Sequence, residues 1–285
     1  MTKRMRLDKL LSHLGTASRT EAKELAKQGR VLVNGKPATD AAMKIDPERD
    51  EVTVDGIRQE YMEHLYVMMN KPAGVITATE DAREKTVLDL LDPKTRGWEP
   101  FPVGRLDKDT EGLLLLTTDG ALAHRLLSPR RHVPKTYVAR VEGEVTEADA
   151  AAFASGVRLD DGYVTMPAEL AIRQVERTDR GTYSFVELTI HEGKFHQVKR
   201  MFLAVGKRVI RLKRIRMGPL ELDPSLAPGT WRQLTADEIA ALAQAGRGKP
   251  EHDAGGASAA AESPGGNMGT TGRESDGEKR WGNSN

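Results

Sequence analysis

The chain has 285 residues, of which 38% are apolar and 30% charged, with no cysteine and a formal net charge of +1. This length allows two domains, and the absence of cysteine excludes disulfides and thiolate metal sites. No stretch is apolar enough for a membrane span, and the basic N-terminus lacks the apolar core of a secretory signal. We therefore expect a cytoplasmic protein that does not contact a membrane.

Two separate regions concentrate the basic residues of this nearly neutral chain. Residues 1–36 contain far more lysine and arginine than acid, and residues 194–216 contain no acid at all. Either region alone is compatible with an ordinary solvated face. Together they favour a polyanionic partner, because phosphates reward clustered lysine and arginine.

The first 60 residues predict two helices and a small hairpin. Leucines spaced over 7–14 predict a helix that Gly15 ends. Ser18 with Glu21 forms a capping box that begins a second helix, which stops at Gly29. The segment "RVLVNGKPA" follows as a strand with a turn at Asn34–Gly35.

From Leu65 the pattern alternates between strands and short helices. We expect a strand, a turn and a second strand start over 65–76, a short helix over 86–91, and a buried strand, turn and helix over 112–127. "KTYVARVEG" and "SFVELTIHEGKFHQ" alternate like antiparallel strands, and 197–206 is helical. Strands and helices without regular βαβ spacing predict an α+β domain.

The expected organisation has three parts. Residues 1–60 are expected to form a small basic module, 63–243 a mixed, mainly antiparallel sheet with flanking helices, and 246–285 a tail. The tail is rich in Gly, Ser, Ala and charge, so we expect it to be disordered.

Several kinds of chemistry are not supported by the motifs. "DKDTEG" resembles the start of a calcium loop, but the twelfth position is Thr118 instead of glutamate. In "HEGKFH" the two histidines are five residues apart, and Gly193 predicts a hairpin turn, so they do not share a helical face for zinc. The chain also lacks a phosphate loop of Walker or Rossmann spacing and a serine nucleophile elbow.

Two resemblances to known families indicate the function of the chain. Residues 5–56, through "RLDKLLSHLG", "SR" and "VNG", resemble the S4-like RNA-binding module. "GRLDKDTEGLLLLTTDG" resembles the signature of the pseudouridine synthases, more narrowly the RsuA-type group, which couples such a module to a catalytic domain. Further matching stretches are "MNKPAGVITATED", "SPRRHVPKTYVARVEG", "EGKFHQVKRMFLAVG", "LKRIRMGPL" and "LAPGTWRQLT".

The resemblance implies the roles of the site residues. Asp107 of "GRLD" is the expected catalytic aspartate, Lys199 the basic residue that pairs with it, and Tyr137 the tyrosine that stacks on the target base. Arg105, two residues before Asp107 on a strand-like stretch, fills the space left by the flipped uridine. Leu212 is expected to pack near the base. Residues expected to bind RNA elsewhere are Lys9, Arg19, Lys23, Lys27, Arg30, Arg200 and Arg214.

The implied reaction detaches uracil at N1 and rejoins C5 to the ribose C1′, with no cofactor and no metal. Whether the aspartate attacks C1′, attacks C6 or deprotonates C2′ stays open, and all three routes need it ionised. "SPRRHVPKTY" is more like the small-subunit enzyme, so we expect a monomer that modifies uridine 516 of 16S rRNA, either free or within a pre-ribosomal particle. The alternatives are a 23S rRNA uridine or a non-catalytic RNA-binding assembly factor.

Overall fold

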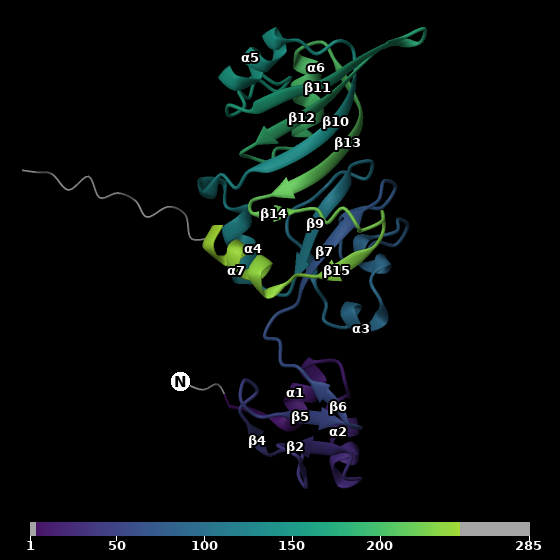
Figure 1. The fold of residues 1–285 in the computed structure, drawn as a ribbon, viewed down its shortest axis with the longest axis vertical. Coiled ribbons are helices and arrows are strands. Elements are labelled where there is room, and N and C mark those ends of the chain that lie inside the picture. Colours follow the sequence, from purple (N-terminus) through teal and green to yellow (C-terminus); the bar gives the residue numbers. More distant parts are fainter. Residues whose placement is uncertain (1–3, 246–285) are drawn as a thin grey trace, which may run out of the picture. The chain divides into compact units, whose positions relative to one another are not determined.

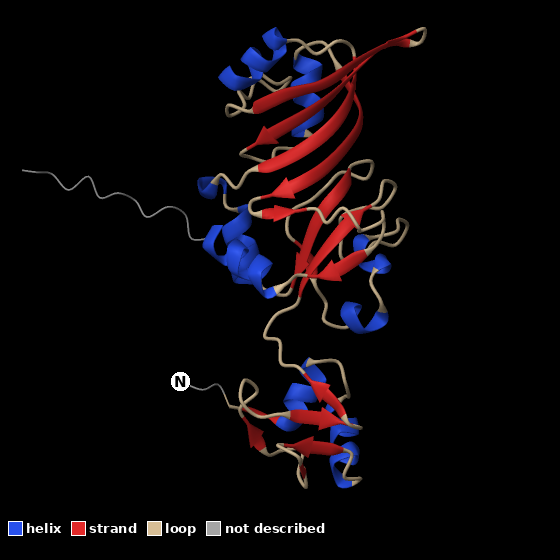
Figure 2. Cartoon of the chain, viewed as in Figure 1, coloured by secondary structure: helices blue, strands red, loops and turns tan. Residues whose placement is uncertain are grey.

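The structure, a computed structural model, describes residues 4–245 (Figures 1 and 2). The glycine-rich segment 246–285, for which the sequence predicts disorder, lies outside the described residues. Within residues 4–245, no helix is both long enough and apolar enough to cross a lipid bilayer.

Residues 5–59 form two short helices and two small antiparallel sheets. The helices are α1 (Leu7–His13) and α2 (Arg19–Lys27). The larger sheet has the order β3-β2-β5-β6, and β1 pairs with β4. The strands are β1 (Met5–Arg6), β2 (Val31–Val33), β3 (Lys36–Pro37), β4 (Lys44–Ile45), β5 (Val52–Val54) and β6 (Ile57–Gln59).

Short sequence patterns explain the helices and the turn of residues 5–59. The predicted capping box is confirmed, since the backbone N–H of Glu21 donates to Ser18 Oγ and the backbone N–H of Ser18 donates to the Glu21 carboxylate. The leucines of the first helix are buried in a single core with Val31 and Ile45. The predicted turn at Asn34–Gly35 joins β2 to β3, and both turn residues have positive φ.

The rest of the described chain is built on one nine-stranded sheet. Its order is β11-β12-β10-β13-β9-β7-β15, with β8 on β9 and β14 on β13. Every pairing is antiparallel except the short parallel contact of β13 with β9, so the predicted mixed, mainly antiparallel α+β fold is confirmed. The strands are β7 (Tyr66–Lys71), β8 (Phe101–Pro102), β9 (Glu111–Thr117), β10 (Lys135–Glu142), β11 (Glu169–Thr178), β12 (Gly181–Ile190), β13 (Arg208–Met217), β14 (Leu220–Glu221) and β15 (Trp231–Gln233).

The four consecutive leucines lie on β9, and both faces of this strand are buried. Leu113 and Leu115 pack in one core with α4 (Gly120–Leu127) and α7 (Ala236–Ala245). Leu114 and Leu116 pack in the other core, which contains α5 (Glu147–Ser155) and α6 (Gln197–Ala204). Side chains alternate between the faces of a strand, so a strand covered on both faces reads as a continuous apolar run.

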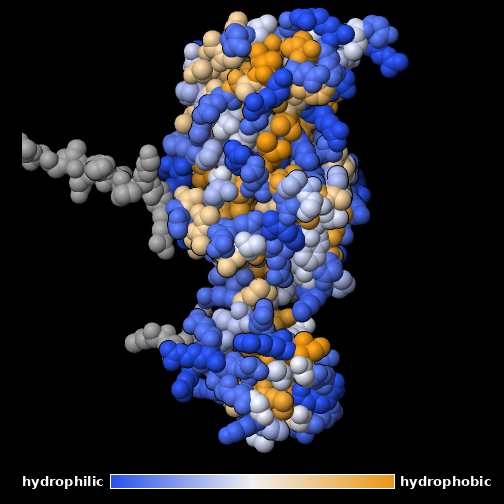
Figure 3. Space-filling view, viewed as in Figure 1, coloured by the Kyte–Doolittle hydropathy of each residue, from blue (hydrophilic) through white to orange (hydrophobic). Residues whose placement is uncertain are grey.

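Helices and one-turn segments cover the sheet unevenly. Figure 1 shows α5 and α6 over the half formed by β10 to β13, whereas α4 and α7 lie beside β14 and β9. The remaining short elements are η1 (Val87–Leu90), α3 (Pro93–Arg96) and η2 (Pro129–Arg131). In the view of Figure 3, hydrophilic residues cover most of the surface and apolar ones gather in the middle of the part built on the large sheet.

Three local predictions differ from the structure. The second strand expected near residue 76 is only an isolated bridge between Ile76 and Thr86. Arg105 lies in a loop between β8 and β9 and not on a strand. "HEGKFH" forms no hairpin but a connection from β12 to α6, since Gln197 begins a helix directly after His196.

Candidate active site

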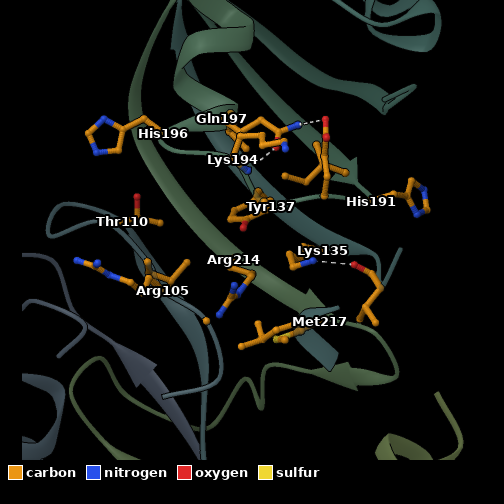
Figure 4. Close-up of a pocket in the computed structure, with 18 of the residues that line it drawn as sticks. Arg105, Thr110, Lys135, Tyr137, His191, Lys194, His196, Gln197, Arg214 and Met217 are labelled. Carbon is orange, nitrogen blue, oxygen red and sulfur yellow. Dashed lines mark hydrogen bonds between the residues drawn. The ribbon is translucent and has the colours of Figure 1, made fainter. Parts of the chain in front are cut away.

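A cavity of about 380 Å³ opens where segments far apart in the sequence meet (Figure 4). It is lined by the loop 103–110, the segment 126–137, the connection 190–199 and side chains of β13. Most of the predicted catalytic side chains therefore meet in one place: Arg105, Asp107, Tyr137, Lys199 and Leu212 all line this cavity.

The loop that carries Asp107 is held by a buried lysine. Lys71, at the end of β7, is completely buried, and its ammonium group donates to the backbone oxygens of Asp107 at 3.0 Å, Lys108 at 3.2 Å and Thr110 at 2.8 Å. Burial lowers the pKa of Lys71 to about 8, against the opposing effect of nearby carboxylates, chiefly Asp109 and Asp107. Lys71 fixes the backbone of the loop and leaves the carboxylate of Asp107 free.

The sequence did not predict this role of Lys71. The only signal is its position, because a lysine two positions after the largely apolar residues 65–69 must find polar partners if the strand is buried. A hydroxyl fixes the loop from the other side, where Thr77 Oγ1 donates to the Leu106 oxygen at 2.8 Å and accepts from the Leu106 backbone N–H at 3.2 Å.

Lys199 brings a positive charge to the same loop. Its ammonium group lies 2.9 Å from Asp107 Oδ2 and 2.6 Å from Asp109 Oδ1. Burial alone would lower the pKa of Lys199, but its hydrogen bonds to the two carboxylates outweigh burial and raise it. Burial and Lys199 act on Asp109 in opposite directions, and the net effect lowers the pKa of Asp109. Lys199 therefore stays protonated at neutral pH and is shared between two carboxylates.

His196 is a further neighbour of Asp107 that the sequence did not predict. Its Nε2 atom lies 3.5 Å from Asp107 Oδ1, and its backbone is in the left-handed region with φ of 48°. The ring stacks on Phe195 with a centroid separation of 3.8 Å. Because we expected these residues in a hairpin turn, no position beside Asp107 was foreseen for them.

Tyr137 and Arg105 approach the cavity from different elements. Tyr137 lies on β10 and is almost completely buried, so its ring forms part of the cavity wall. Arg105 is exposed and follows Gly104, whose φ of 78° turns the loop sharply. Figure 4 places Arg105 at one side of the cavity, with Tyr137 near its centre.

A polar network supports the opposite wall. Glu192 accepts hydrogen bonds from the Tyr163 hydroxyl at 2.6 Å, from Gln197 Nε2 at 2.7 Å and from the backbone N–H of Met166 at 2.9 Å. These bonds fix the connection between β12 and α6, which carries His196 and leads to Lys199. No sequence pattern indicated Glu192 as part of the site.

Arg214 was predicted to contact RNA, and its place in the structure is unusual for a surface contact. The side chain is only 2% exposed and lines the cavity, with Nε donating to the backbone oxygen of Leu113 at 2.8 Å. Lys135 lies nearby on β10, and burial together with the charge of Arg214 lowers the pKa of Lys135 to about 8. Arg214 therefore belongs to the cavity and not to the outer surface.

The other predicted RNA contacts lie outside the cavity. Arg200, on α6, is engaged by Asp160 and Asp161. Lys27 is paired with Glu24 at 2.8 Å and Arg30 with Asp55 at 2.6 Å. Three exposed basic residues of α1 and α2 form no ion pair within the described part of the chain: Lys9, Arg19 and Lys23.

Among residues 4–245, no group of three or more histidine, aspartate or glutamate side chains is placed to hold a metal ion. Asp107 and Asp109 both form ion pairs with Lys199. The chemistry that the described side chains support is that of a carboxylate beside a cation, in a cavity with an aromatic wall.

Comparisons with known proteins agree with this geometry. A family model described as RNA pseudouridylate synthase matches residues 65–204, and an S4 domain model matches residues 5–52. A solved structure described as a pseudouridylate synthase superposes with a TM-score of 0.55 at 36% identity and covers 84% of this chain and 99% of that one.

Curated relatives match over most of their length. An uncharacterized RNA pseudouridine synthase of Bacillus subtilis, YtzG, is 52% identical over 82% of this chain and 97% of its own. The ribosomal small subunit pseudouridine synthase A of Yersinia pestis is 44% identical over 84% and 98%. The ribosomal large subunit pseudouridine synthase B of Bacillus subtilis is 41% identical over 83% and 95%.

Proposed function

The chain belongs to the RNA pseudouridylate synthase family, and we propose that it converts one uridine of 16S rRNA, the position usually numbered 516, into pseudouridine. The observation that carries the proposal is the contact of Asp107 with Lys199 at 2.9 Å, at the wall of a cavity lined by Tyr137. A cavity of about 380 Å³ lies within the range of small-molecule sites, so a single flipped nucleotide is a suitable occupant.

The proposed roles follow from the placement of each side chain. Asp107 acts as the carboxylate that the reaction needs in its ionised form, and the ammonium group of Lys199 lies 2.9 Å from it. The ring of Tyr137 stacks on the uracil. Arg105, exposed at the side of the cavity, occupies the space that the uridine leaves in the RNA. These side chains perform the isomerisation without a cofactor.

The choice of 16S rRNA rests on one segment. Identity to the small-subunit enzyme, 44%, and to the large-subunit enzyme, 41%, is too similar to decide between them. The segment "SPRRHVPKTY" is of the small-subunit type, and several of its residues line the cavity: Ser128, Pro129, His132, Val133, Lys135 and Tyr137. A segment that lines the cavity is well placed to select the substrate.

The N-terminal S4 domain supplies a second RNA contact in this proposal. Lys9, Arg19 and Lys23 are exposed on its two helices and can bind phosphates of the ribosomal RNA, free or within a pre-ribosomal particle. We place the protein in the cytoplasm, where its substrate is made, as a monomer. Because the chain belongs to a family of enzymes, the alternative of a purely non-catalytic assembly factor is not favoured.

Mapping pseudouridines in rRNA tests the proposal. A strain that lacks this protein should lose one pseudouridine in 16S rRNA and keep those in 23S rRNA. A plasmid with the wild-type gene should restore it, and one with Asp107→Asn should not. Loss of a 23S pseudouridine instead would mean that the protein modifies large-subunit rRNA. This is the second candidate substrate, because a relative named for the large subunit is 41% identical.

A further inference from the structure

Two buried polar atoms without partners belong to residues at the wall of the candidate active site. Among the described residues, six buried side-chain nitrogen or oxygen atoms have no hydrogen-bond partner. Two of the six, Nη2 of Arg214 and Oγ1 of Thr110, belong to residues that line the cavity. Buried polar groups in native proteins are almost always satisfied, so unpaired groups around a cavity indicate that its occupant supplies the missing partner.

Arg214 is the more informative of the two because its position is fixed. It lies on β13 at the parallel contact with Gly112 of β9, and Nε donates to the oxygen of Leu113. Within residues 4–245 no carboxylate forms an ion pair with its guanidinium group. Figure 4 shows Arg214 next to Tyr137 and Lys135. The guanidinium group is therefore held in place at the wall of the cavity, and its Nη2 atom has no hydrogen-bond partner.

The nearby charges favour an electron-rich occupant. Lys135 is a further cation that lines the cavity, and the one hydrogen bond of its ammonium group within residues 4–245 is to the backbone oxygen of Val133, at 2.9 Å. The positive charge of Arg214 and burial both lower the pKa of Lys135, which shows that the two cations repel each other in this wall of the cavity. Glu192 opposes this effect only in part. An occupant with an acceptor oxygen, and above all one that gains negative charge, is favoured here.

The chemistry of the proposed reaction identifies that oxygen. The phosphates of a flipped nucleotide remain on the RNA strand, while the base goes deepest into the cavity. When the bond between N1 and C1′ breaks heterolytically, the bonding pair stays on the uracil and spreads over N1, O2 and O4. A donor already placed at O2 or O4 stabilises this charge without reorganisation.

Resting on the proposed function, we propose that Nη2 of Arg214 donates a hydrogen bond to a carbonyl oxygen of the target uracil, and stabilises the base while it is detached from the ribose. Arg214 is then a residue that binds the reacting base and not one of the phosphate contacts on the RNA surface. Tyr137 holds the face of the same ring, and Arg214 holds its edge.

The experiment compares the wild-type enzyme, a variant at Arg214 and a control variant on chemically modified RNAs. The substrate is a 16S rRNA fragment with uridine, 2-thiouridine or 4-thiouridine at the target position, and single-turnover rates are measured at saturating RNA. Sulfur is a poor hydrogen-bond acceptor, so at the contacted position it should slow the wild-type enzyme about tenfold to a hundredfold, as expected for a hydrogen bond to a charged group.

Arg214→Lys, which keeps the charge and loses the planar fork, should be slow on uridine but nearly insensitive to the same sulfur. Arg140→Lys is the matched control, because Arg140 lies on β10 with its guanidinium over the Tyr183 ring, outside the residues that line the cavity. This control should keep the full sulfur sensitivity of the wild-type enzyme.

Three results would overturn the proposal. If neither sulfur substitution slows the wild-type enzyme, no carbonyl contact matters, and this result needs no variant to fold. If sulfur slows wild type and Arg214→Lys equally, the contact belongs to another group. If methylphosphonate beside the target slows wild type but not Arg214→Lys, the guanidinium binds phosphate. In all three cases formation of pseudouridine on unmodified RNA still supports the proposed function, whose own failure would be the absence of product.

Discussion

The ammonium group of Lys199 lies 2.9 Å from Oδ2 of Asp107, although the two residues are 92 positions apart. The contact exists because the first turn of α6 meets the loop before β9 at the cavity. Lys199 also contacts Asp109 at 2.6 Å, so one cation serves two carboxylates. The contact with Lys199 holds the carboxylate of Asp107 in one orientation at the wall of the cavity.

Asp107→Asn should abolish isomerisation and leave folding and RNA binding nearly unchanged, because the amide keeps the shape of the side chain and loses its charge. Release of tritium from RNA labelled at C5 of uridine measures turnover. Asp109→Asn is the matched control, since this residue contacts the same lysine but does not line the cavity. It should retain most of the activity, and appreciable turnover by Asp107→Asn would contradict the proposed mechanism.

Lys199→Met should reduce turnover by a factor on the order of 10² to 10³, the usual cost of removing one preorganised electrostatic partner. Binding of the RNA should change much less. The measurement is the single-turnover rate at saturating RNA, with Lys199→Arg as a variant that preserves the charge and should recover much of the rate. Equal losses in both variants would mean that the charge beside Asp107 is not what Lys199 contributes.

Lys71→Met should lower both the melting temperature and the rate, since the loop oxygens of Asp107, Lys108 and Thr110 would lose their donor. In the wild-type protein the pKa of Lys71 is about 8, below its ordinary value of 10.5. The folded protein therefore loses this proton at a lower pH than the unfolded chain does. Between pH 8 and 10.5 the titration of this group makes the free energy of unfolding rise with pH. The neutral amine, however, has fewer hydrogens to donate to the loop oxygens, so the loop itself is held less firmly.

The rate of the wild-type enzyme should accordingly fall above about pH 8 as the loop loosens. A profile of single-turnover rates from pH 6.5 to 9.5 checks this. Lys135 titrates in the same range, so Lys135→Gln is the necessary comparison. If the alkaline fall persists in Lys135→Gln and is lost in Lys71→Met, Lys71 causes it, and the opposite outcome assigns it to Lys135.

Replacing Lys9, Arg19 and Lys23 together by glutamine should weaken RNA binding and make it less dependent on salt. Each phosphate contact contributes about 0.7 to 0.9 to the slope of log affinity against log salt, so losing three contacts should reduce the slope by about 2 to 3. Filter binding between 50 and 300 mM salt measures it. Arg173→Gln with Arg177→Gln, which removes two ion-paired arginines of β11, is the control and should leave the slope unchanged.

Gly112→Ala should separate β9 from β13 and thereby disrupt the site. A Cβ atom at position 112 would lie 2.2 Å from the backbone oxygen of Arg214, and the φ of 102° disfavours any side chain. The backbone conformation alone costs about 1–3 kcal/mol. Thermal unfolding should show a clear loss of stability, whereas Gly120→Ala in α4, with no atom within 4 Å of its Cβ, should unfold like wild type.

Local patterns predicted those elements whose causes are local. The capping box of Ser18 and Glu21 and the buried leucine strand depend on neighbours in the sequence and on side-chain alternation, and both are found in the structure. The connection from β12 to α6 was mispredicted because Gly193 looks like a hairpin residue. Its conformation is set by Glu192, which bonds to Tyr163 and Met166 far away in the sequence.

Some of the cavity residues could be predicted from the sequence, and others could not. The resemblance to a known signature indicated Asp107, Tyr137 and Lys199, but no periodicity could place them together. Lys71 and Arg214 looked like ordinary basic residues, and their burial follows only from the pairing of strands 40 to 100 residues distant, such as Arg214 with Leu113. Burial of a charged residue depends on the complete fold, so the sequence alone could not show it.

The order of the strands also determines when, during synthesis, the protein gains its abilities. The small sheet of β2, β3, β5 and β6 uses only residues 31–59, so the S4 part can fold early as the chain leaves the ribosome. The cavity needs β13, which ends at Met217, between β9 and β10. Nascent chains can therefore acquire affinity for RNA long before they can modify it, and translation has to be nearly complete before catalysis begins.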